Sequence, residues 1–393
     1  MRGHRCWYRH RMMSFDAIVI GGGIAGVSIG YELSADRSVC LLEMEDQLAF
    51  HTTGRSVATF LESYGGRVVR LLTTGSRAFM EDPPDGFGRP LLTALALLWV
   101  APHGEAQDLR DMATSVGEFV TMQTLTADEV DEVAPVFRPG WVALGLLEPG
   151  ASEIDVASLH GGYAGGLQRR GGAVRTRAGA VAITRSDGRW TVTDRQGQSY
   201  EAPVLVNAAG AWCDQIAELA GVRPIGIQPL RRTVFTFAPP PGINSGRVPL
   251  VGDVGANFYF KKEGAHILCS PADETPSPPC DAKVEEIDVA RAIDVINAAT
   301  TFNVRSIRSS WAGLRNFVAD RSPVAGFDDN AEGFFWFAGQ GGYGIQIAPA
   351  LAQIGASIVR TGEMPTALAA RGLDIAMLGR ARLDRLTATD VRQ

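Results

Sequence analysis

The chain has 393 residues, of which 46% are hydrophobic and 20% charged, and a formal net charge of −6. This length is enough for two domains that share a large core, and the lack of a Lys/Arg-rich block beyond the first residues argues against a nucleic-acid-binding protein. No apolar stretch reaches the roughly twenty residues of a membrane span, the basic start lacks the apolar core of a signal peptide, and the five cysteines show no paired metal-type spacing. We therefore expect a cytoplasmic, reduced, metal-free protein in which residues 1–13 are a flexible N-terminal extension.

The first motif is an apolar run that stops at the glycine cluster of residues 21–26. Gly21 permits a tight turn, Gly23 lets the backbone approach a pyrophosphate, and Gly26 lets a helix pack on the strand. Glu43 closes the second apolar run, at the spacing of an acid that accepts hydrogen bonds from a ribose 2′-hydroxyl. The glycines alone would also fit an ordinary strand-to-helix turn, but the order strand, turn, helix, strand predicts an adenine-dinucleotide site.

Downstream, the pattern of helices and strands is mixed and does not simply alternate. Thr126 begins a capping box, Asp155 is placed to cap the helix that follows it, and Asp187 with Gly188 predicts a hairpin turn. The predicted helices include residues 25–33, 67–79, 284–298 and 347–360, and the predicted strands include 91–100, 173–177, 180–186, 190–194, 201–206 and 334–338. A nucleotide-binding core that the chain leaves and re-enters is the simplest account of this order.

Three further motifs bear on which dinucleotide is bound. Residues 204–212 form a buried strand that ends at small residues, where a larger side chain would block a ligand, although helix-on-strand packing would explain them too. Arg55 and Ser56 follow Gly54 at the start of an expected helix, where N–H groups and the Ser hydroxyl meet phosphate or flavin oxygens, or form a simple N-cap. Residues 340–346 open the last long helix, whose positive end suits the negative charge of a reduced flavin. This last motif favours a flavin over a nicotinamide.

Together these motifs resemble the FAD-dependent D-amino-acid oxidase and dehydrogenase family, which includes glycine oxidase and sarcosine oxidase, and they are most similar to bacterial D-arginine dehydrogenase. The resemblance runs from Phe15 to about Leu378. The matching segments are the glycine motif with Glu43, His51–Ser56, Tyr64, Asn207–Trp212, Arg231-Arg232, Phe235–Gly242, Phe258-Tyr259, Trp311–Arg315 and Gln340–Gln346.

The resemblance implies an α/β (α+β) fold, with a Rossmann-like FAD-binding domain and a second, mostly antiparallel-sheet substrate domain inserted discontinuously. It also implies a noncovalent FAD, which takes a hydride at N5 from the Cα of a D-amino acid, after which the imino acid hydrolyses to a 2-oxo acid and ammonia. The expected FAD-binding domain comprises residues 14–89, 147–208 and 314–393, and the expected substrate-binding domain comprises residues 90–146 and 209–313. The cofactor-binding residues expected from the matched positions are Gly21, Gly23, Ile24, Ala25, Gly26, Glu43, Thr53, Gly54, Arg55, Ser56, Val181, Ala209, Gly210, Trp212, Arg315, Gly341, Gly342, Tyr343, Gly344, Ile345 and Gln346.

The resemblance also identifies four residues that would act on the substrate. Arg232 and Arg315 match carboxylate-binding positions, which suits the planar fork that arginine offers a carboxylate, and Tyr259 would donate its phenolic O–H to the same group. Tyr64 matches a residue on a mobile loop that closes over the substrate. Arg231 is expected to point to the opposite face of its strand and to be structural.

One departure from the family pattern concerns the substrate side chain. Our alignment places Leu97 where D-arginine dehydrogenases have the glutamate that receives the substrate guanidinium, and residues 90–100 contain no acid. Because a buried cation without a partner would cost several kcal/mol, we expect a substrate with a neutral or apolar side chain. Glu62 is the one nearby acid that would restore cation binding, if it turned inward.

Several alternatives stay open at this level. The carboxylate-binding residues would serve a secondary amine such as sarcosine or proline, or a 2-hydroxy acid, and a catalytically silent flavin-binding subunit is a further reading. His51 lies in a His-x-x-Gly setting in which some related amine dehydrogenases attach FAD covalently; we expect it to be a loop residue without such a bond. The expected partners are a small amino-acid substrate and an unidentified electron acceptor, which is a quinone, a redox carrier or oxygen. Oxidase and dehydrogenase activity are not distinguished, and neither is the oligomeric state.

Overall fold

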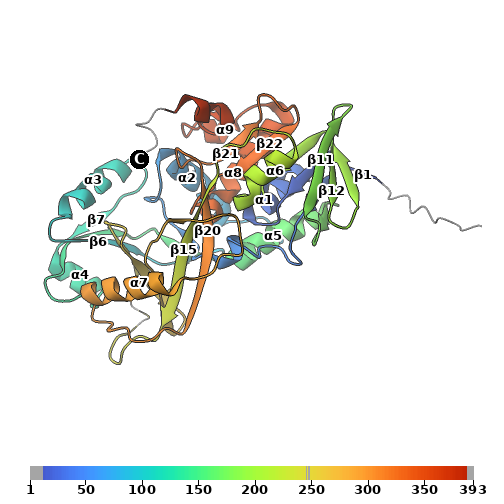
Figure 1. The fold of residues 1–393 in the computed structure, drawn as a ribbon. Helices are drawn as coiled ribbons and strands as arrows, with labels where there is room; N and C mark the ends of the chain where they lie inside the picture. The colour runs from blue at the N-terminus through green and yellow to red at the C-terminus, as the bar shows by residue number, and fades with distance from the viewer. Residues whose placement is uncertain (1–11, 245, 247, 387–393) are drawn as a thin grey trace, which may run out of the picture.

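The computed structural model of the chain describes residues 12–244, 246 and 248–386. Within these residues the chain forms four sheets, of six, nine, four and three strands. Figure 1 shows strands β11 and β12 at one end of the molecule and helices α3, α4 and α7 at the other. Residues 1–11 of the expected extension lie outside the described residues, whereas Met13 belongs to strand β1 and pairs with Tyr200.

The six-stranded sheet is the Rossmann-like core. Neighbouring strands are parallel except for the antiparallel pair β21 and β22. Four of the strands are buried along their whole length, as continuous apolar runs predict for parallel strands covered on both faces. The strands in spatial order are β10 (Ala173–Arg175), β3 (Val39–Leu42), β2 (Ala17–Ile20), β14 (Val204–Asn207), β22 (Phe334–Ala338) and β21 (Val324–Phe327).

Helices cover one face of this sheet and a strand meander covers the other. Alternation along β2 directs Val19 into the core shared with the helices and Ile18 into the core shared with the meander. The helices on the first face are α1 (Ile24–Leu33), α2 (Arg67–Glu81), α5 (Val156–Arg169) and α8 (Gly344–Thr361). On the other face lie α6 (Cys213–Leu219) and the four-stranded sheet β1 (Met13–Ser14), β13 (Ser199–Ala202), β12 (Arg189–Asp194) and β11 (Ala180–Ser186).

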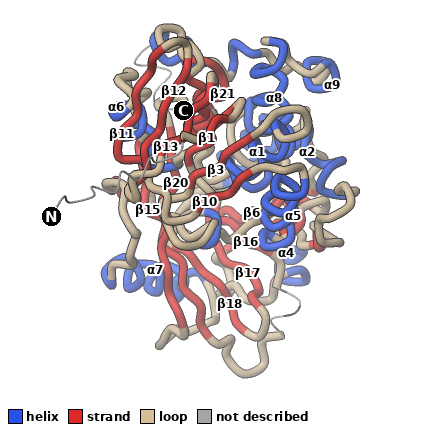
Figure 2. The backbone as a smooth tube through the Cα atoms, turned by 90° about the vertical axis from the view of Figure 1, so that its right-hand side faces the viewer, coloured by secondary structure: helices blue, strands red, loops and turns tan. Residues whose placement is uncertain are grey.

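The nine-stranded sheet forms the second domain and is antiparallel apart from the pair β16 and β6. Figure 2 shows β15, β16, β17 and β18 side by side, with α7 next to them. The sheet comprises β19 (Thr275–Pro276), β15 (Gln228–Phe237), β18 (His266–Ser270), β17 (Tyr259–Glu263), β16 (Leu250–Asp253), β6 (Leu97–Pro102), β8 (Val142–Glu148) and β7 (Gln123–Leu125), with β20 (Ser309–Phe317) on the free side of β15. This domain and the Rossmann-like core confirm the predicted fold class.

Helices α4 and α7 pack on one face of the nine-stranded sheet and leave most of the opposite face toward the Rossmann-like core. Val130 of α4 and Val289 of α7 join the apolar core of that covered face, while Leu109 of α3 packs at the far end of the other face. Besides short 3₁₀ turns, the described residues also form α3 (Ala106–Val116), α4 (Ala127–Val133), α7 (Glu286–Ala299), α9 (Thr366–Ala369) and the three-stranded sheet β4 (Thr59–Phe60), β9 (Ser152–Ile154) and β5 (Leu92–Ala94). The expected domain limits at 146/147 and 313/314 fall inside β8 and β20, whose ladders continue across them.

Local signals in the sequence are confirmed where they act over a few residues. Thr126 and Glu129 form the capping box of α4, Asp155 accepts from the Ser158 N–H at the start of α5 at 2.9 Å, and Asp187 lies in the turn between β11 and β12 with a positive φ.

Two predicted strands are wrong in extent. Residues 201–206 are divided between β13 and β14 in different sheets, because Pro203 has no N–H to continue a ladder. Residues 91–100 are likewise divided between β5 and β6.

Candidate active site

A cavity of about 840 Å³ is lined by elements of both the Rossmann-like core and the nine-stranded sheet. The core contributes the ends of β2 and β14, the loop after β3 and the start of α8, and the sheet contributes β6, β15, β16, β17 and β20. In open α/β sheets, ligands bind outside the carboxyl ends of the parallel strands. The cavity therefore lies where the glycine motif predicts a dinucleotide.

The turn between β2 and α1 is built so closely that glycine is required. A Cβ on Gly21, whose φ is +111°, would lie 2.4 Å from the Ala208 carbonyl oxygen, and one on Gly26 would lie 1.8 Å from the Gly21 carbonyl oxygen. The Gly22 N–H donates to Glu43 Oε2 at 2.7 Å, so the acid at the end of β3 is held beside the turn. A dinucleotide phosphate can approach the backbone here because no side chain covers it.

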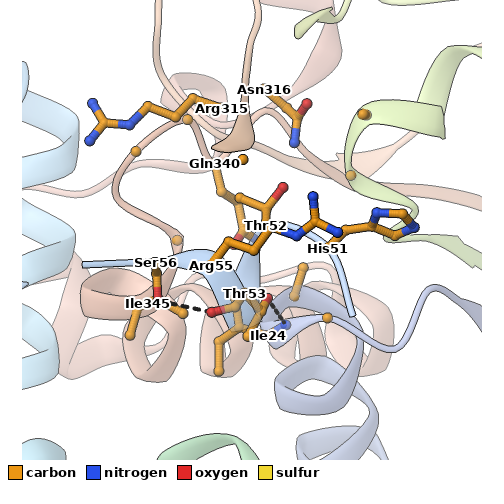
Figure 3. A pocket seen from close by; sticks show the side chains of 18 of the residues that line it. Ile24, His51, Thr52, Thr53, Arg55, Ser56, Arg315, Asn316, Gln340 and Ile345 are labelled. Atoms are coloured by element: carbon orange, nitrogen blue, oxygen red, sulfur yellow. Dashed lines mark hydrogen bonds between the residues drawn. The ribbon is translucent and has the colours of Figure 1, made fainter. Parts of the chain in front are cut away.

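The segment after β3 differs from the expected helix. Thr53–Arg55 form a single 3₁₀ turn that ends at Ser56, which is extended. Thr53 Oγ1 accepts from the Ile24 N–H at 3.0 Å, and Ser56 Oγ donates back to the Thr53 carbonyl at 2.9 Å (Figure 3). The Arg55 guanidinium reaches the carbonyl oxygens of Ala282 and Ala312, at 3.0 and 3.1 Å. The segment is thus fixed by long-range contacts to α1 and to the second domain, and the turn does not continue into a helix.

A second glycine turn precedes α8. Gly341 has a φ of +54°, and a Cβ there would lie 2.2 Å from the Phe317 ring, while one on Gly342 would lie 2.9 Å from Arg315. The helix begins at Gly344, three residues earlier than predicted. Its first N–H groups open onto the cavity, as the sequence motif indicates.

Asn316 and Gln340 are cavity residues that the site prediction missed. Asn316 Oδ1 and Gln340 Nε2 are buried and have no hydrogen-bond partner among the described residues. Figure 3 shows that the side chains of Arg315 and Asn316 extend in opposite directions from β20. Strand alternation would place only one of these two side chains in the cavity, yet both residues line it, because the end of β20 projects into the cavity. The Gly341 N–H donates to the Asn316 carbonyl at 2.9 Å and ties this end of β20 to the second glycine turn.

Arg315 is a cation without an acidic partner among the described ion pairs. Its Nη1 donates to Tyr64 Oη at 3.0 Å. Burial opposes its charge, yet the phenol oxygens of Tyr64, Tyr259 and Tyr343 outweigh burial and raise the pKa of Arg315. The group is therefore a permanent positive charge that faces the cavity and has a place for an anion.

Arg232 is held differently. Its Nε donates to the Asp273 carbonyl at 2.7 Å, and its Nη2 lies 3.3 Å from Glu274 Oε1, which also receives Arg321 at 2.7 Å. The Arg232 guanidinium faces the Tyr259 ring, 5.9 Å from its centroid. The Tyr259 hydroxyl is buried in the cavity wall and has no partner among the described residues.

Most of the residues expected at the cofactor and substrate lie in the cavity wall: Gly21, Gly23, Ile24, Ala25, Glu43, Thr53, Arg55, Ser56, Tyr64, Ala209, Gly210, Trp212, Arg232, Tyr259, Arg315 and residues 341–346. Val181 does not; it is 54% exposed on β11, and the lining there comes from residues 178–180. Gly26 and Gly54 are also absent from the wall, because each is pressed against backbone, the Gly21 and Ala49 carbonyl groups respectively.

One part of the cavity wall is apolar. Leu61, Leu97 and Leu250 belong to one buried cluster against which Trp99 and Tyr259 pack. Glu62 does not turn inward, because its carboxylate pairs with the Arg77 guanidinium at 2.7 and 3.0 Å.

The residues present fit an FAD-sized dinucleotide. At the two glycine turns no side chain covers the backbone, because a Cβ there would clash. Both oxygens of Glu43 are held by backbone N–H groups: Oε2 accepts from Gly22 at 2.7 Å and Oε1 from Glu45 at 2.9 Å. His51 Nδ1, Asn316 Oδ1 and Gln340 Nε2 are buried around the cavity without a partner in the described part of the chain, although buried polar atoms are normally paired. A polar ligand in the cavity would give them partners.

Two searches of the described residues bear on other classes of site. In residues 12–244, 246 and 248–386, no group of three or more His, Cys, Asp or Glu side chains is arranged to hold a metal ion. Over the same residues, no helix combines the length and apolar character that crossing a bilayer requires.

Comparison with known proteins gives one family match and several relatives. The sequence profile of the family described as "DAO: FAD dependent oxidoreductase" matches residues 16–358. Human mitochondrial dimethylglycine dehydrogenase is 25% identical over 378 residues, which cover 89% of this chain and 43% of that protein. L-2-hydroxyglutarate dehydrogenase of Escherichia coli is 26% identical over 241 residues, covering 57% of this chain and 54% of that protein. The chain thus spans about half or less of the length of these relatives.

Solved structures show the same fold. Glycine oxidase from Geobacillus kaustophilus superposes with a TM-score of 0.80 at 21% identity, covering 94% of this chain and 99% of that one. L-proline dehydrogenase from P. horikoshii superposes with a TM-score of 0.79 at 19% identity, covering 95% and 99%.

Proposed function

The chain belongs to the FAD dependent oxidoreductase (DAO) family, with FAD as its cofactor, and from that premise we propose that it oxidises a D-amino acid with a neutral or apolar side chain. The product is an imino acid, which hydrolyses to a 2-oxo acid and ammonia. When bound, FAD supplies the two-electron oxidant, and the residues of the chain bind and orient the amino acid. The D configuration rests on the motif resemblance.

The charge of Arg315, which has no acidic partner among the described residues, carries this proposal. A half-buried guanidinium with no acid among the described residues is costly unless a ligand supplies the anion, and Tyr64, Tyr259 and Tyr343 are the phenols around it. A carboxylate bound to Arg315 would also accept from the Tyr259 hydroxyl, which has no other partner among the described residues. This accounts for a small carboxylic acid as substrate, while Arg232 already has Glu274.

The side-chain part of the proposal rests on the apolar wall. Leu61, Leu97 and Leu250 would contact a substrate side chain. Asp253 also borders the cavity. Its Oδ2 accepts from the Asn257 side chain at 2.7 Å, and its Oδ1 is buried without a partner among the described residues. Alternation places its carboxylate on the other face of β16 from Leu250 and Gly252. With Glu62 paired to Arg77, a substrate cation would lack a partner at this wall.

The test is anaerobic mixing of the yellow holoenzyme with single amino acids. D-Leu, D-Met and D-Phe should bleach the flavin rapidly and D-Arg and D-Lys slowly, with L-Leu as the stereochemical control. Preference for the basic pair would contradict the apolar wall. Reduction by L-Leu alone would contradict the D configuration.

Replacement of Leu97 tests the wall directly. Leu97→Glu should raise kcat/KM for D-Arg relative to D-Leu by roughly 10- to 100-fold, the scale of one charge-assisted hydrogen bond. Leu97→Gln is the matched control, because it has the same shape without the charge. An equal change in both variants would show that the charge at this position does not select the substrate.

A second candidate is oxidation of a secondary or tertiary amine, or of a 2-hydroxy acid. It is supported by the similarity to dimethylglycine dehydrogenase over 89% of the chain, and the same carboxylate site would serve these acids. Sarcosine, proline and a 2-hydroxy acid therefore belong in the same panel. A flavin that no small carboxylic acid reduces would favour a catalytically silent subunit. The electron acceptor, whether a quinone, a redox carrier or oxygen, would be identified by reoxidising the bleached enzyme with each in turn.

A further inference from the structure

Tyr64 lies on a short loop of residues 61–66 between β4 and α2, here called the Tyr64 loop. The loop ends at Gly65, whose φ is +84°, and Gly66. Its tyrosine accepts from Arg315 Nη1 at 3.0 Å, and the ring lies edge-on to Tyr343 at 5.1 Å. This contact exists only while the loop stays against the cavity, so whatever fixes the loop also fixes the carboxylate site.

The first residue of the loop is fixed from the FAD-binding side. The Leu61 N–H donates to Gln346 Oε1 at 3.2 Å, and Gln346 Nε2 donates to the Leu61 carbonyl at 3.3 Å. Gln346 belongs to the first turn of α8. The main chain of Leu61 is therefore tied to the helix that opens onto the cavity.

The next two residues are fixed from the other side by a carboxylate that the proposed reaction does not use. Glu148 ends β8 beside Leu97, and its side chain is 0% exposed. It accepts from the Glu62 N–H at 2.9 Å and from the Ser63 hydroxyl at 2.5 Å. Trp99 Nε1 lies 3.4 Å from Ser63 Oγ, from the strand next to β8.

The environment of Glu148 is unfavourable for an acid. None of the ion pairs among the described residues includes Glu148, and burial raises its pKa against the hydrogen bonds from Ser63 and Glu62. A buried carboxylate without a cation lowers stability relative to an apolar residue of the same size. Its main gain is the set of hydrogen bonds to two consecutive loop residues.

We propose that Glu148 is a positioning residue, which holds the Tyr64 loop against the nine-stranded sheet so that Tyr64 and Arg315 meet the substrate carboxylate together. This inference rests on the proposed function, since the site that it serves is a carboxylate site. Glu148 is not among the described residues that line the cavity, and it acts through Ser63 and the main chain of Glu62. Gln346 and Glu148 together hold the loop between the two domains.

The test measures binding of benzoate, as a simple carboxylate, to FAD-loaded enzyme through the change in flavin absorbance. E148A should weaken benzoate binding roughly tenfold, the effect of losing one well-placed hydrogen bond, with FAD content unchanged. E148Q should restore binding, because the amide oxygen still accepts from the Glu62 N–H and the Ser63 hydroxyl can turn to accept from the amide. In a Y64F background E148A should add little, because the two substitutions remove the same interaction.

The matched control is D194A. Asp194 is also a buried carboxylate, which accepts from the Gln196 N–H at 2.9 Å and from the Tyr200 hydroxyl at 3.0 Å, in the four-stranded sheet. D194A should lower the melting temperature without changing benzoate affinity. Hydrogen exchange at residues 61–66 should accelerate in E148A and not in D194A.

Wild-type affinity in E148A, or an effect of E148A that adds fully to that of Y64F, would overturn the proposal. If E148A does not fold, S63A serves instead. Its benzoate affinity should fall about two- to threefold, because the substitution removes one of these hydrogen bonds. An S63A variant that binds benzoate as tightly as the wild type would overturn the proposal as well. If benzoate does not bind the wild type at all, the carboxylate site itself fails, and the proposed function fails with it. If the wild type binds benzoate and E148A binds it equally well, only the positioning role is rejected.

Discussion

At the scale of single residues, neighbours on one strand have different roles because a strand alternates its side chains. Arg231 donates to Asp288 at 2.8 Å and also pairs with Glu285, both at the start of α7, which confirms its predicted structural role. Arg232 faces the cavity and shares Glu274 with Arg321. Arg315 has no acidic partner among the described residues, so we expect its contact with Tyr64 to govern how the site responds to pH.

Tyr64 is expected to set the high-pH limit of substrate binding. Burial opposes ionisation of its phenol, but the Arg315 and Arg232 guanidinium groups outweigh burial and lower the pKa of Tyr64. As the pH rises through this lowered pKa, the phenolate that forms pairs with Arg315 and competes with the substrate carboxylate. The KM should therefore rise at a pH below the value of about 10 for free tyrosine.

The measurement is the pH profile of KM for D-Leu in the wild type and in Tyr64→Phe. The amine of the substrate titrates in both proteins, so only the difference between the profiles reports on Tyr64. The variant should have a higher KM at neutral pH and lack the early rise. Parallel profiles would mean that Tyr64 does not titrate in this range.

His51 gives a prediction about how FAD is held. Its Nε2 lies 3.0 Å from Glu45 Oε1, its ring faces Trp212 at 4.6 Å, and its Nδ1 has no partner among the described residues. We expect FAD to be bound without a covalent bond, so acid precipitation should leave the yellow colour in the supernatant. A yellow pellet that becomes colourless in His51→Ala would show attachment at this residue.

At the scale of elements, the β2–α1 turn depends on two backbones in contact. A Cβ on Gly26 would meet the Gly21 carbonyl oxygen at 1.8 Å, and backbone cannot move aside as a side chain can. Gly30, one turn later in α1, would place its Cβ 3.3 Å from the end of the Leu167 side chain. Substitutions at these two glycines therefore distinguish a steric requirement of the turn from one of the helix that follows it.

Gly26→Ala should destabilise the protein by about 3 kcal/mol or more, at the upper end of the cost of overpacking, and should lower its FAD content. Gly30→Ala should be nearly neutral, because alanine favours the helix by about 1 kcal/mol and Leu167 can shift. Urea unfolding and the ratio of flavin to protein absorbance measure both effects. Equal stability of the two variants would contradict the steric account of the motif.

At the scale of the whole molecule, the cavity wall is shared between the two domains. The turn at Gly21 and the start of α8 come from the Rossmann-like core, whereas Arg232 and Tyr259 come from the nine-stranded sheet. A ligand that binds only the folded, assembled wall stabilises both domains together. Binding of FAD should therefore be coupled to the stability of the entire chain.

FAD at about 100 times its dissociation constant should raise the free energy of unfolding by about 2.7 kcal/mol. Thermal melts of apoprotein with increasing FAD measure this gain. Riboflavin is the matched control, since it lacks the adenosine diphosphate that Gly21 and Glu43 are placed to bind. Equal shifts with the two flavins would contradict the assignment of that end of the cavity.

The sequence by itself determined the features that act over short distances along the chain. The glycine turn after β2, the cap at Asp155 and the hairpin at Asp187 depend on a few neighbouring residues, and they are found as predicted. The family motifs extended this to the fold class and to FAD. Most of the expected wall residues follow from these same motifs, because each motif ends at the cavity.

Tertiary structure alone decided which of these residues meet. Arg315 and Tyr64 are 251 positions apart, and Ser63 and Glu148 are 85 apart. The pairing of Glu62 with Arg77, the exposure of Val181 and the place of Asn316 in the cavity depend equally on how the elements pack. Local sequence patterns indicate which face of a strand or helix is buried, whereas packing between distant segments decides which residue meets that face. The apolar wall proposed for the substrate could therefore be located only in the folded chain.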